Sequence, residues 1–147
     1  MNPSDFREIW VIDFEYGQTV SGLPEPRCLV AKELHSKKII KRWLESEENP
    51  IPEFSNQDPS QLFVCFFAPA ELGCFLELDW EFPLFVLDLF VEFRNLTNGI
   101  KLPSGNSLIG ALSYFDLPHI DSAEKRDLRD LALRGGDYTH KEKDGLL

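Results

Sequence analysis

Apolar runs separated by short polar stretches divide the chain into its expected elements. The first run, 9–16, ends with acidic residues at every second position, which predicts a strand with one charged end. A Gly/Pro-rich turn over 18–26 follows it. Two further runs, 27–34 and 38–44, are rich in β-forming residues, and the short polar stretch 35–37 between them predicts a hairpin. We therefore expect an antiparallel three-stranded meander at the start of the chain.

The middle of the chain predicts a loop, a strand and a helix. Residues 45–59 are acidic, proline-rich and without periodicity, as is typical of a loop. The continuous apolar run 62–67 predicts a strand that is buried on both faces. Pro69 favours the first position of a helix, which we expect to reach Asp79. The residues expected to face the core from this helix are Leu72, Phe75 and Leu76.

The last third of the chain predicts one more buried strand and then helices. The strand covers 84–89, and we expect helices over 90–96 and 107–115. Asp121 and Glu124 have the spacing of a capping box, which predicts a helix to Leu133 that Gly135-Gly136 ends. Thr139 is expected to cap a final helix.

This order of elements predicts the fold class. Three strands, then strand, helix, strand and several helices are typical of an α/β domain with a mixed sheet. A chain of 147 residues, 43% of them apolar, fits a single domain over 1–147. No leader-like segment and no stretch of roughly 20 apolar residues is seen, so we expect a cytoplasmic protein without a membrane helix. Cys28, Cys65 and Cys74 lie in apolar surroundings and are expected to be reduced core thiols.

The net charge of -10 excludes one kind of nucleic-acid binding. A protein that holds nucleic acid through a broad basic surface depends on Lys and Arg to release phosphate counterions. A metal-dependent nuclease remains compatible with this charge, because cations bound in its site reverse the local sign.

The acidic end of the first strand is a candidate metal site. Asp13 and Glu15 lie on the same face of the strand and roughly 7 Å apart, since each residue adds about 3.3 Å. Carboxylates at this spacing suit a hard divalent cation. Taken alone, an Asp-x-Glu pair at a strand end is more simply explained as the solvated start of a loop.

Several motifs together are more specific than this pair. A strand with Asp13-x-Glu15, a meander, a strand followed by Glu71 in a helix, and a strand with Asp88 resemble, in that order, the DEDD 3′-to-5′ exonucleases, which have a ribonuclease H-like fold. The chain is also similar to the N-terminal exonuclease region of bacterial and phage family A DNA polymerases. The segments that carry this closer resemblance are 67–74, 86–94 and 128–136.

The resemblance implies roles for three acids. Asp13 and Glu15 match the first exonuclease motif, whose acids bind the catalytic Mg²⁺ or Mn²⁺ ions. Glu71 lies where the second motif usually has an aspartate, so its longer side chain is a departure from the family. Without the resemblance, Glu71 would be explained as an acid in the first turn of a helix, where the helix dipole stabilises it by about 0.3 to 1 kcal/mol.

The third exonuclease motif, a Tyr or His followed by Asp, is expected just after the end of the chain, so the domain would be incomplete at its C-terminus. His140 and Asp144 are four residues apart on the last helix, but we interpret them as part of a solvated face. The fourth acid and the general base would then be missing. We assign no role to His35 and His119.

The leading hypothesis is a proofreading-like 3′-5′ exonuclease domain of a DNA polymerase, with the polymerase domain C-terminal in the parent protein. It would hydrolyse single-stranded DNA 3′ ends with two metal ions, impaired by the loss of the last motif. The alternatives are a catalytically inactive structural or interaction module of the same fold, and an RNA-trimming exoribonuclease. Asp88 and Glu92 are expected to cap a helix or to lie at the surface, with metal binding as the less favoured alternative for each.

Overall fold

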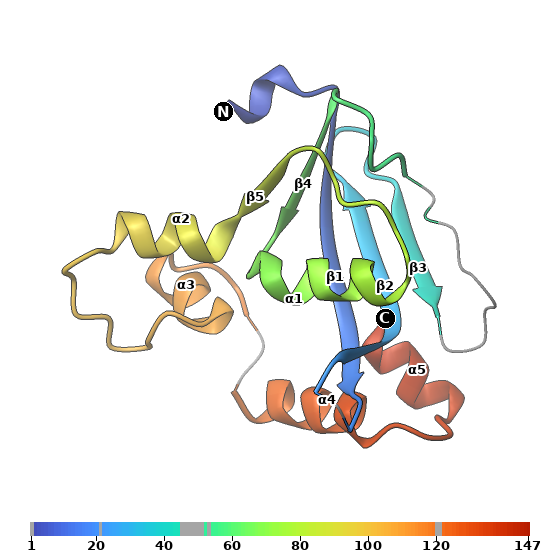
Figure 1. Cartoon of the computed structure of the whole chain (residues 1–147). Helices are drawn as coiled ribbons and strands as arrows, with labels where there is room; N and C mark the ends of the chain where they lie inside the picture. The colour runs from blue at the N-terminus through green and yellow to red at the C-terminus, as the bar shows by residue number, and fades with distance from the viewer. Residues whose placement is uncertain (1, 21, 45–51, 53, 120–121) are drawn as a thin grey trace.

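A five-stranded mixed sheet with the strand order β3-β2-β1-β4-β5 organises the protein (Figure 1). The computed structural model describes residues 2–20, 22–44, 52, 54–119 and 122–147. Its strands are β1 (Glu8–Gln18), β2 (Pro24–Glu33), β3 (Ile39–Trp43), β4 (Gln61–Cys65) and β5 (Val86–Asp88). The pairs β1–β2 and β2–β3 are antiparallel, and β1–β4 and β4–β5 are parallel. The predicted meander and the α/β class with a mixed sheet are confirmed.

The helices follow the predicted order. They are α1 (Ala68–Glu77), α2 (Leu89–Leu96), α3 (Leu108–Tyr114), α4 (Ser122–Arg134) and α5 (His140–Leu146), with a short 3₁₀ helix, η1, over Pro3–Asp5. Figure 1 shows α1 crossing in front of β1 and β2, α2 and α3 beside β5, and α4 near the carboxyl end of β1. No helix within the described part of the chain is long and apolar enough to cross a membrane.

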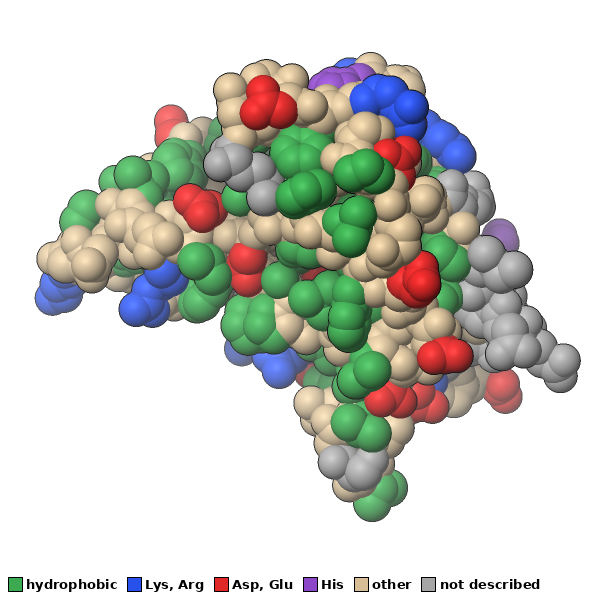
Figure 2. All heavy atoms as spheres, turned by 45° about the horizontal axis from the view of Figure 1, so that its top comes forward, with side chains coloured by type: hydrophobic (Ala, Val, Ile, Leu, Met, Phe, Trp, Pro, Cys, Tyr) green, Lys and Arg blue, Asp and Glu red, His purple; other side chains and the backbone are tan. Residues whose placement is uncertain are grey.

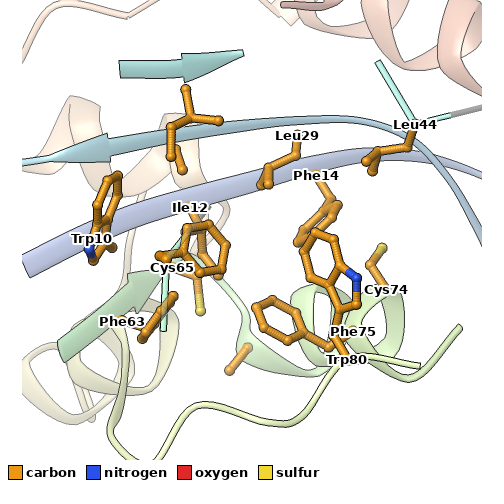
Figure 3. Close-up of a cluster of buried hydrophobic side chains, with 14 residues drawn as sticks. Trp10, Ile12, Phe14, Leu29, Leu44, Phe63, Cys65, Cys74, Phe75 and Trp80 are labelled. Atoms are coloured by element: carbon orange, nitrogen blue, oxygen red, sulfur yellow. The ribbon is translucent and has the colours of Figure 1, made fainter. Parts of the chain in front are cut away.

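The main core lies between α1 and one face of the sheet (Figure 3). Trp10, Ile12 and Phe14 of β1 point to this face, because alternate residues of a strand share a side. Phe14 packs edge-on against Phe75 of α1, with ring centroids 5.8 Å apart. Ile9 belongs to a second cluster of buried residues, with Leu62 and Val64. The predicted alternation of β1 is therefore confirmed.

Helices α4 and α5 pack against part of the opposite face of the sheet, around Cys28. Cys28 of β2 is paired with Glu15 of β1, so the two side chains share a face. Cys28 is buried there against Ala132 of α4 and Leu146 of α5. The cysteines are free and buried, as predicted.

The inner face of α1 differs from the prediction. Leu72 is partly buried against the core and Phe75 is fully buried, but Leu76 is 63% exposed. Glu71 and Cys74 are buried in its place, so the positions that face the sheet are separated by three or four residues, one helical turn. The prediction from hydrophobic positions was wrong for Leu76, because one of the residues that α1 buries against the sheet is the carboxylic acid Glu71.

Two strands also differ from their predicted form. β2 begins at Pro24, inside the expected turn. β3 pairs with β2 only from Cys28 onward, so the first residues of β2 have a free edge, where proline is tolerated. β5 is a half-buried edge strand of three residues, where a longer buried strand was expected.

The helix caps bear out most of the boundary predictions. Ser107 caps α3, and Thr139 forms a capping box with Glu142 at the start of α5. Gly135 and Gly136 both have positive φ at the end of α4, as expected for residues that terminate a helix. The predicted capping box of α4 cannot be compared, since Asp121 and the side chain of Glu124 lie outside the described residues, as do residues 45–51 and 53 of the predicted loop.

Many large hydrophobic side chains remain at the surface. They include Leu76 on α1 and Phe82 and Leu84 in the segment before β5, each at least 49% exposed. Figure 2 shows hydrophobic side chains over much of the face that it presents, with acidic side chains between them. Scattered apolar exposure of this kind is normal for a small domain.

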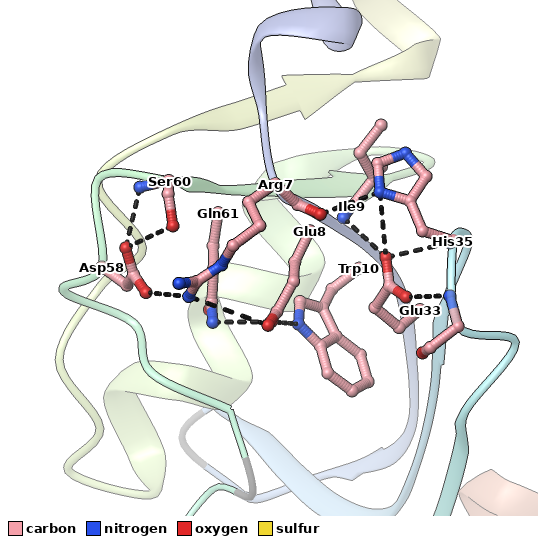
Figure 4. Close-up of polar contacts among 10 residues, drawn as sticks. Arg7, Glu8, Ile9, Trp10, Glu33, His35, Asp58, Ser60 and Gln61 are labelled. Carbon is pink, nitrogen blue, oxygen red and sulfur yellow. Dashed lines mark hydrogen bonds and ion pairs between the residues drawn. The ribbon is translucent and has the colours of Figure 1, made fainter.

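A buried carboxylate joins the amino end of β1 to the β2–β3 turn (Figure 4). Glu33 is 3% exposed and accepts hydrogen bonds from the backbone N–H groups of Ile9 (3.0 Å), His35 (3.0 Å) and Ser36. Burial raises the pKa of Glu33, but the hydrogen bonds from Ser36, His35 and Ile9 outweigh it and lower the pKa to about 2. The ionised carboxylate therefore stabilises this end of the sheet.

We expect Glu33→Gln to lower the free energy of unfolding at pH 7 by about 1 to 3 kcal/mol, because its amide cannot accept all three N–H bonds. In the wild type this contribution is complete above the unfolded pKa near 4.5 and is lost as the pH falls toward about 2. Urea unfolding at pH 7 and between pH 5 and pH 2 measures both effects. The exposed Glu81→Gln is the control; equal losses in the two variants would contradict the role of Glu33.

Candidate functional site

The site forms where β1 and β4 separate. The two strands are paired in parallel only from Glu8 to Val11 of β1, and β4 ends at Cys65 while β1 continues to Gln18. The chain leaves β4 through Phe66 and Phe67 and enters α1. The crevice at the carboxyl ends of parallel strands is where α/β sheets commonly bind ligands.

Glu71 connects α1 to β1 in this crevice. Its Oε2 accepts a hydrogen bond of 3.0 Å from the backbone N–H of Phe14, which lies beyond the last β1 residue paired to β4. Glu71 is 4% exposed. Burial, and then the negative charge of Asp13, raise the pKa of Glu71 to about 9. At neutral pH this carboxyl group therefore keeps its proton unless a cation offsets the repulsion.

Asp13 and Glu15 face the same cavity as Glu71. The cavity has a volume of about 540 Å³, and these three acids and Tyr16 are among its lining residues. The β1–β2 register shifts between Glu15 and Tyr16, and a bulge of this kind bends a strand and redirects its side chains. Asp13 is exposed and Glu15 half-buried. The structure thus brings together the three acids that the sequence singled out.

Helices α3 and α4 form the other wall of the cavity. Its residues from these helices are mostly apolar: Leu108, Ile109, Leu112, Leu128, Ala132 and Leu133. Arg129 of α4 and His119, from the segment before α4, also line it. Sequence reasoning missed both residues, because neither has a partner at ligand spacing along the chain. Nδ1 of His119 lies 2.8 Å from the carbonyl oxygen of Leu117, so the neutral ring keeps its acceptor at Nε2.

Asp88 positions the N-termini of two helices. Its carboxylate accepts hydrogen bonds from the N–H groups of Phe67 (3.2 Å) and Ala68 (2.9 Å) at α1, and from those of Phe90 (2.9 Å) and Val91 (3.3 Å) at α2. Phe67 has a left-handed backbone, with φ 81°, which is strained for a residue other than glycine. Asp88 is therefore a capping residue, as predicted, and Glu92 is exposed in the first turn of α2.

The remaining histidines lie away from the cavity. His140 and Asp144 are exposed on α5, with Nε2 and Oδ2 3.7 Å apart, and neither lines the cavity. The interpretation of this pair as a solvated face is confirmed. Nδ1 of His35 lies 2.8 Å from the carbonyl oxygen of Arg7, at the amino end of β1.

The donor chemistry of the cavity suits a hard cation, because three carboxyl groups open onto it. Within the described part of the chain, no group of three or more His, Cys, Asp or Glu side chains is already arranged to hold a metal ion. Asp13, Glu15 and Glu71 therefore share a cavity without forming a preformed cluster.

The chain matches no protein-family model, no curated protein and no solved structure.

Proposed function

We propose that this protein is a DEDD-type 3′-to-5′ exonuclease domain that acts on single-stranded DNA ends, in the manner of the proofreading domain of a polymerase. The observation that supports it most directly is the convergence of Asp13, Glu15 and Glu71 on one cavity at the carboxyl ends of β1 and β4. Glu71 is 56 residues from Glu15 in the chain, so this convergence is a product of the fold.

The sheet is compatible with this proposal. A ribonuclease H-like domain is expected to have an antiparallel meander followed by parallel strands, and the order β3-β2-β1-β4-β5 with its pairing directions agrees with that architecture. A polymerase domain, C-terminal in the parent protein, is the partner that the resemblance implies.

Asp13, Glu15 and Glu71 are the residues that would hold Mg²⁺ or Mn²⁺. Such ions, when bound, stabilise the attacking and leaving oxygens of an in-line phosphodiester hydrolysis. The protein contributes the orientation of the acids: the strand separates Asp13 from Glu15 by one residue, and the Phe14 N–H holds Glu71 beside them. Helices α3 and α4 supply a mostly apolar wall to the same cavity.

A structural module of the same fold is the second candidate, and one observation favours it. A protonated Glu71 already has a role, since its Oε2 accepts the N–H of Phe14 and joins α1 to β1. In that case the carboxyl groups of the cavity bind no cation and the protein hydrolyses no strand.

Asp13→Asn separates these candidates. We expect the substitution to reduce Mn²⁺ binding by at least tenfold, because it removes the charge of an exposed carboxylate and almost no volume. Calorimetry with Mn²⁺ measures the binding, and digestion of a labelled single DNA strand, beside an RNA strand of equal length, measures the activity. Asp5→Asn, in η1, is the control. Unchanged Mn²⁺ affinity in Asp13→Asn would refute the metal role, and absence of binding by the wild type would support the structural module.

A further inference from the structure

One guanidinium of this acidic protein faces the cavity without a partner among the described residues. Arg129 lies on α4, is exposed, and lines the cavity together with Asp13, Glu15 and Glu71. The described residues offer it no hydrogen bond and no ion pair. Its charge is therefore available to a ligand that enters the cavity.

Some other arginines of the described chain are paired with carboxylates. Arg7 lies 2.9 Å from Asp58, and Arg134 lies 2.7 Å from Glu142. With 25 acidic and 15 basic residues, the chain has an excess of carboxylates for this purpose. Arg129 lines a cavity with three acids, and no ion pair joins it to any of them among the described residues.

The electrostatic surroundings of Tyr16 agree with this position. Burial raises the pKa of the Tyr16 hydroxyl and the charge of Arg129 lowers it, so the guanidinium is within electrostatic range of a second cavity residue. Arg129 thus lines the cavity from α4 while the acids line it from β1 and α1.

The rest of the α3 and α4 wall is apolar, with Leu108 and Ile109 from α3 and Leu133 from α4. A nucleotide has a flat, largely apolar base and a phosphate with oxygens that match the donor geometry of a guanidinium. A guanidinium on the α4 side of the cavity could therefore bind a phosphate separately from the acids.

We propose that Arg129 binds a phosphate of the single-stranded 3′ end, while the apolar wall of α3 and α4 contacts the terminal base. This inference rests on the proposed function, because it assumes an oligonucleotide in the cavity. Arg129 acts as a substrate-binding residue, and its contribution is independent of the binding of metal by the acids.

The test is the binding of a labelled single-stranded oligothymidylate, followed by fluorescence anisotropy with Ca²⁺ over a range of salt concentrations. We expect Arg129→Gln to weaken binding about tenfold and to reduce the slope of log K against log salt by about 0.7, the value for one phosphate contact on a single strand. Arg129→Lys keeps the charge and should keep most of the slope. Mn²⁺ affinity, measured by calorimetry, should be unchanged in Arg129→Gln.

Arg126→Gln is the matched control, because Arg126 is an exposed residue of the same helix that does not line the cavity. An affinity and slope in Arg129→Gln equal to those of Arg126→Gln would refute the role of Arg129 and leave the proposed function standing. Failure of the wild-type protein to bind both Mn²⁺ and the oligonucleotide would overturn both proposals.

Discussion

Replacing Glu71 with Gln is expected to stabilise the metal-free protein at pH 8 and to abolish its response to Mn²⁺. In the folded state the pKa of Glu71 is about 9, well above the ordinary glutamic acid value of 4.5, so the carboxyl group takes up a proton when the chain folds at pH 8. The folded state then binds more protons than the unfolded state between these two pKa values, and the stability of the wild type falls as the pH rises through this range. Gln is neutral throughout and keeps an oxygen that can accept the N–H of Phe14.

The expected gain for Glu71→Gln at pH 8 is about 2 to 4 kcal/mol in the free energy of unfolding, and it should shrink toward pH 5. Urea unfolding in the presence of EDTA, followed by tryptophan fluorescence, measures it. Added Mn²⁺ should raise the stability of the wild type and leave the variant unchanged, because binding to the folded state alone shifts the unfolding equilibrium.

Glu77→Gln is the control, since Glu77 is an exposed acid of the same helix. Its stability should follow the pH dependence of the wild type. Parallel pH profiles for the wild type and Glu71→Gln would contradict the protonated state of Glu71. A Mn²⁺ response that survives in Glu71→Gln would instead contradict its role as a metal ligand.

Asp88→Ala is expected to lower the free energy of unfolding by about 2 to 4 kcal/mol. The substitution removes the acceptor of four backbone N–H groups at two helix N-termini, where a single lost cap costs about 1 kcal/mol. It also releases the strained backbone of Phe67, which precedes the helix that carries Glu71. Urea unfolding gives the loss, and Mn²⁺ calorimetry should show weaker binding.

Asp88→Asn should cost less, because its remaining oxygen can still cap α2 through Phe90. Glu92→Ala, an exposed acid in the first turn of α2, controls for the loss of charge near the helix dipole and should cost under 1 kcal/mol. A loss in Asp88→Ala no greater than in Glu92→Ala would show that the four hydrogen bonds contribute little.

The placement of the three acids was predicted from the sequence, but the burial of Glu71 was not. The alternation in β1 placed Asp13 and Glu15 on one face, and this result needed only the two-residue period of a strand. The position of Glu71 on α1 followed from Pro69 at the helix start. The burial of Glu71 and its raised pKa did not follow, because both depend on where β4 ends relative to β1.

Arg129 and His119 illustrate the same limit at longer range. Each lines the cavity from a segment more than 100 residues after β1, and no spacing along the chain indicates that they meet the acids. Leu76 was wrongly expected to face the core for a related reason. A leucine is more hydrophobic than a glutamic acid, yet α1 buries Glu71 and exposes Leu76. The hydrogen bond from the N–H of Phe14 compensates part of the cost of burying Glu71.

The sequence by itself determined the order of the elements, the antiparallel meander, the alternating faces of β1 and most of the helix caps. These are local properties, set by hydrophobic period, turn residues and capping side chains within a few positions of one another. Only the tertiary structure decided which side chains share the cavity and which of them carries a proton. Those properties arise from the separation of β1 from β4 and from the packing of α3 and α4 around it, where burial and neighbouring charge, rather than residue type, set the pKa.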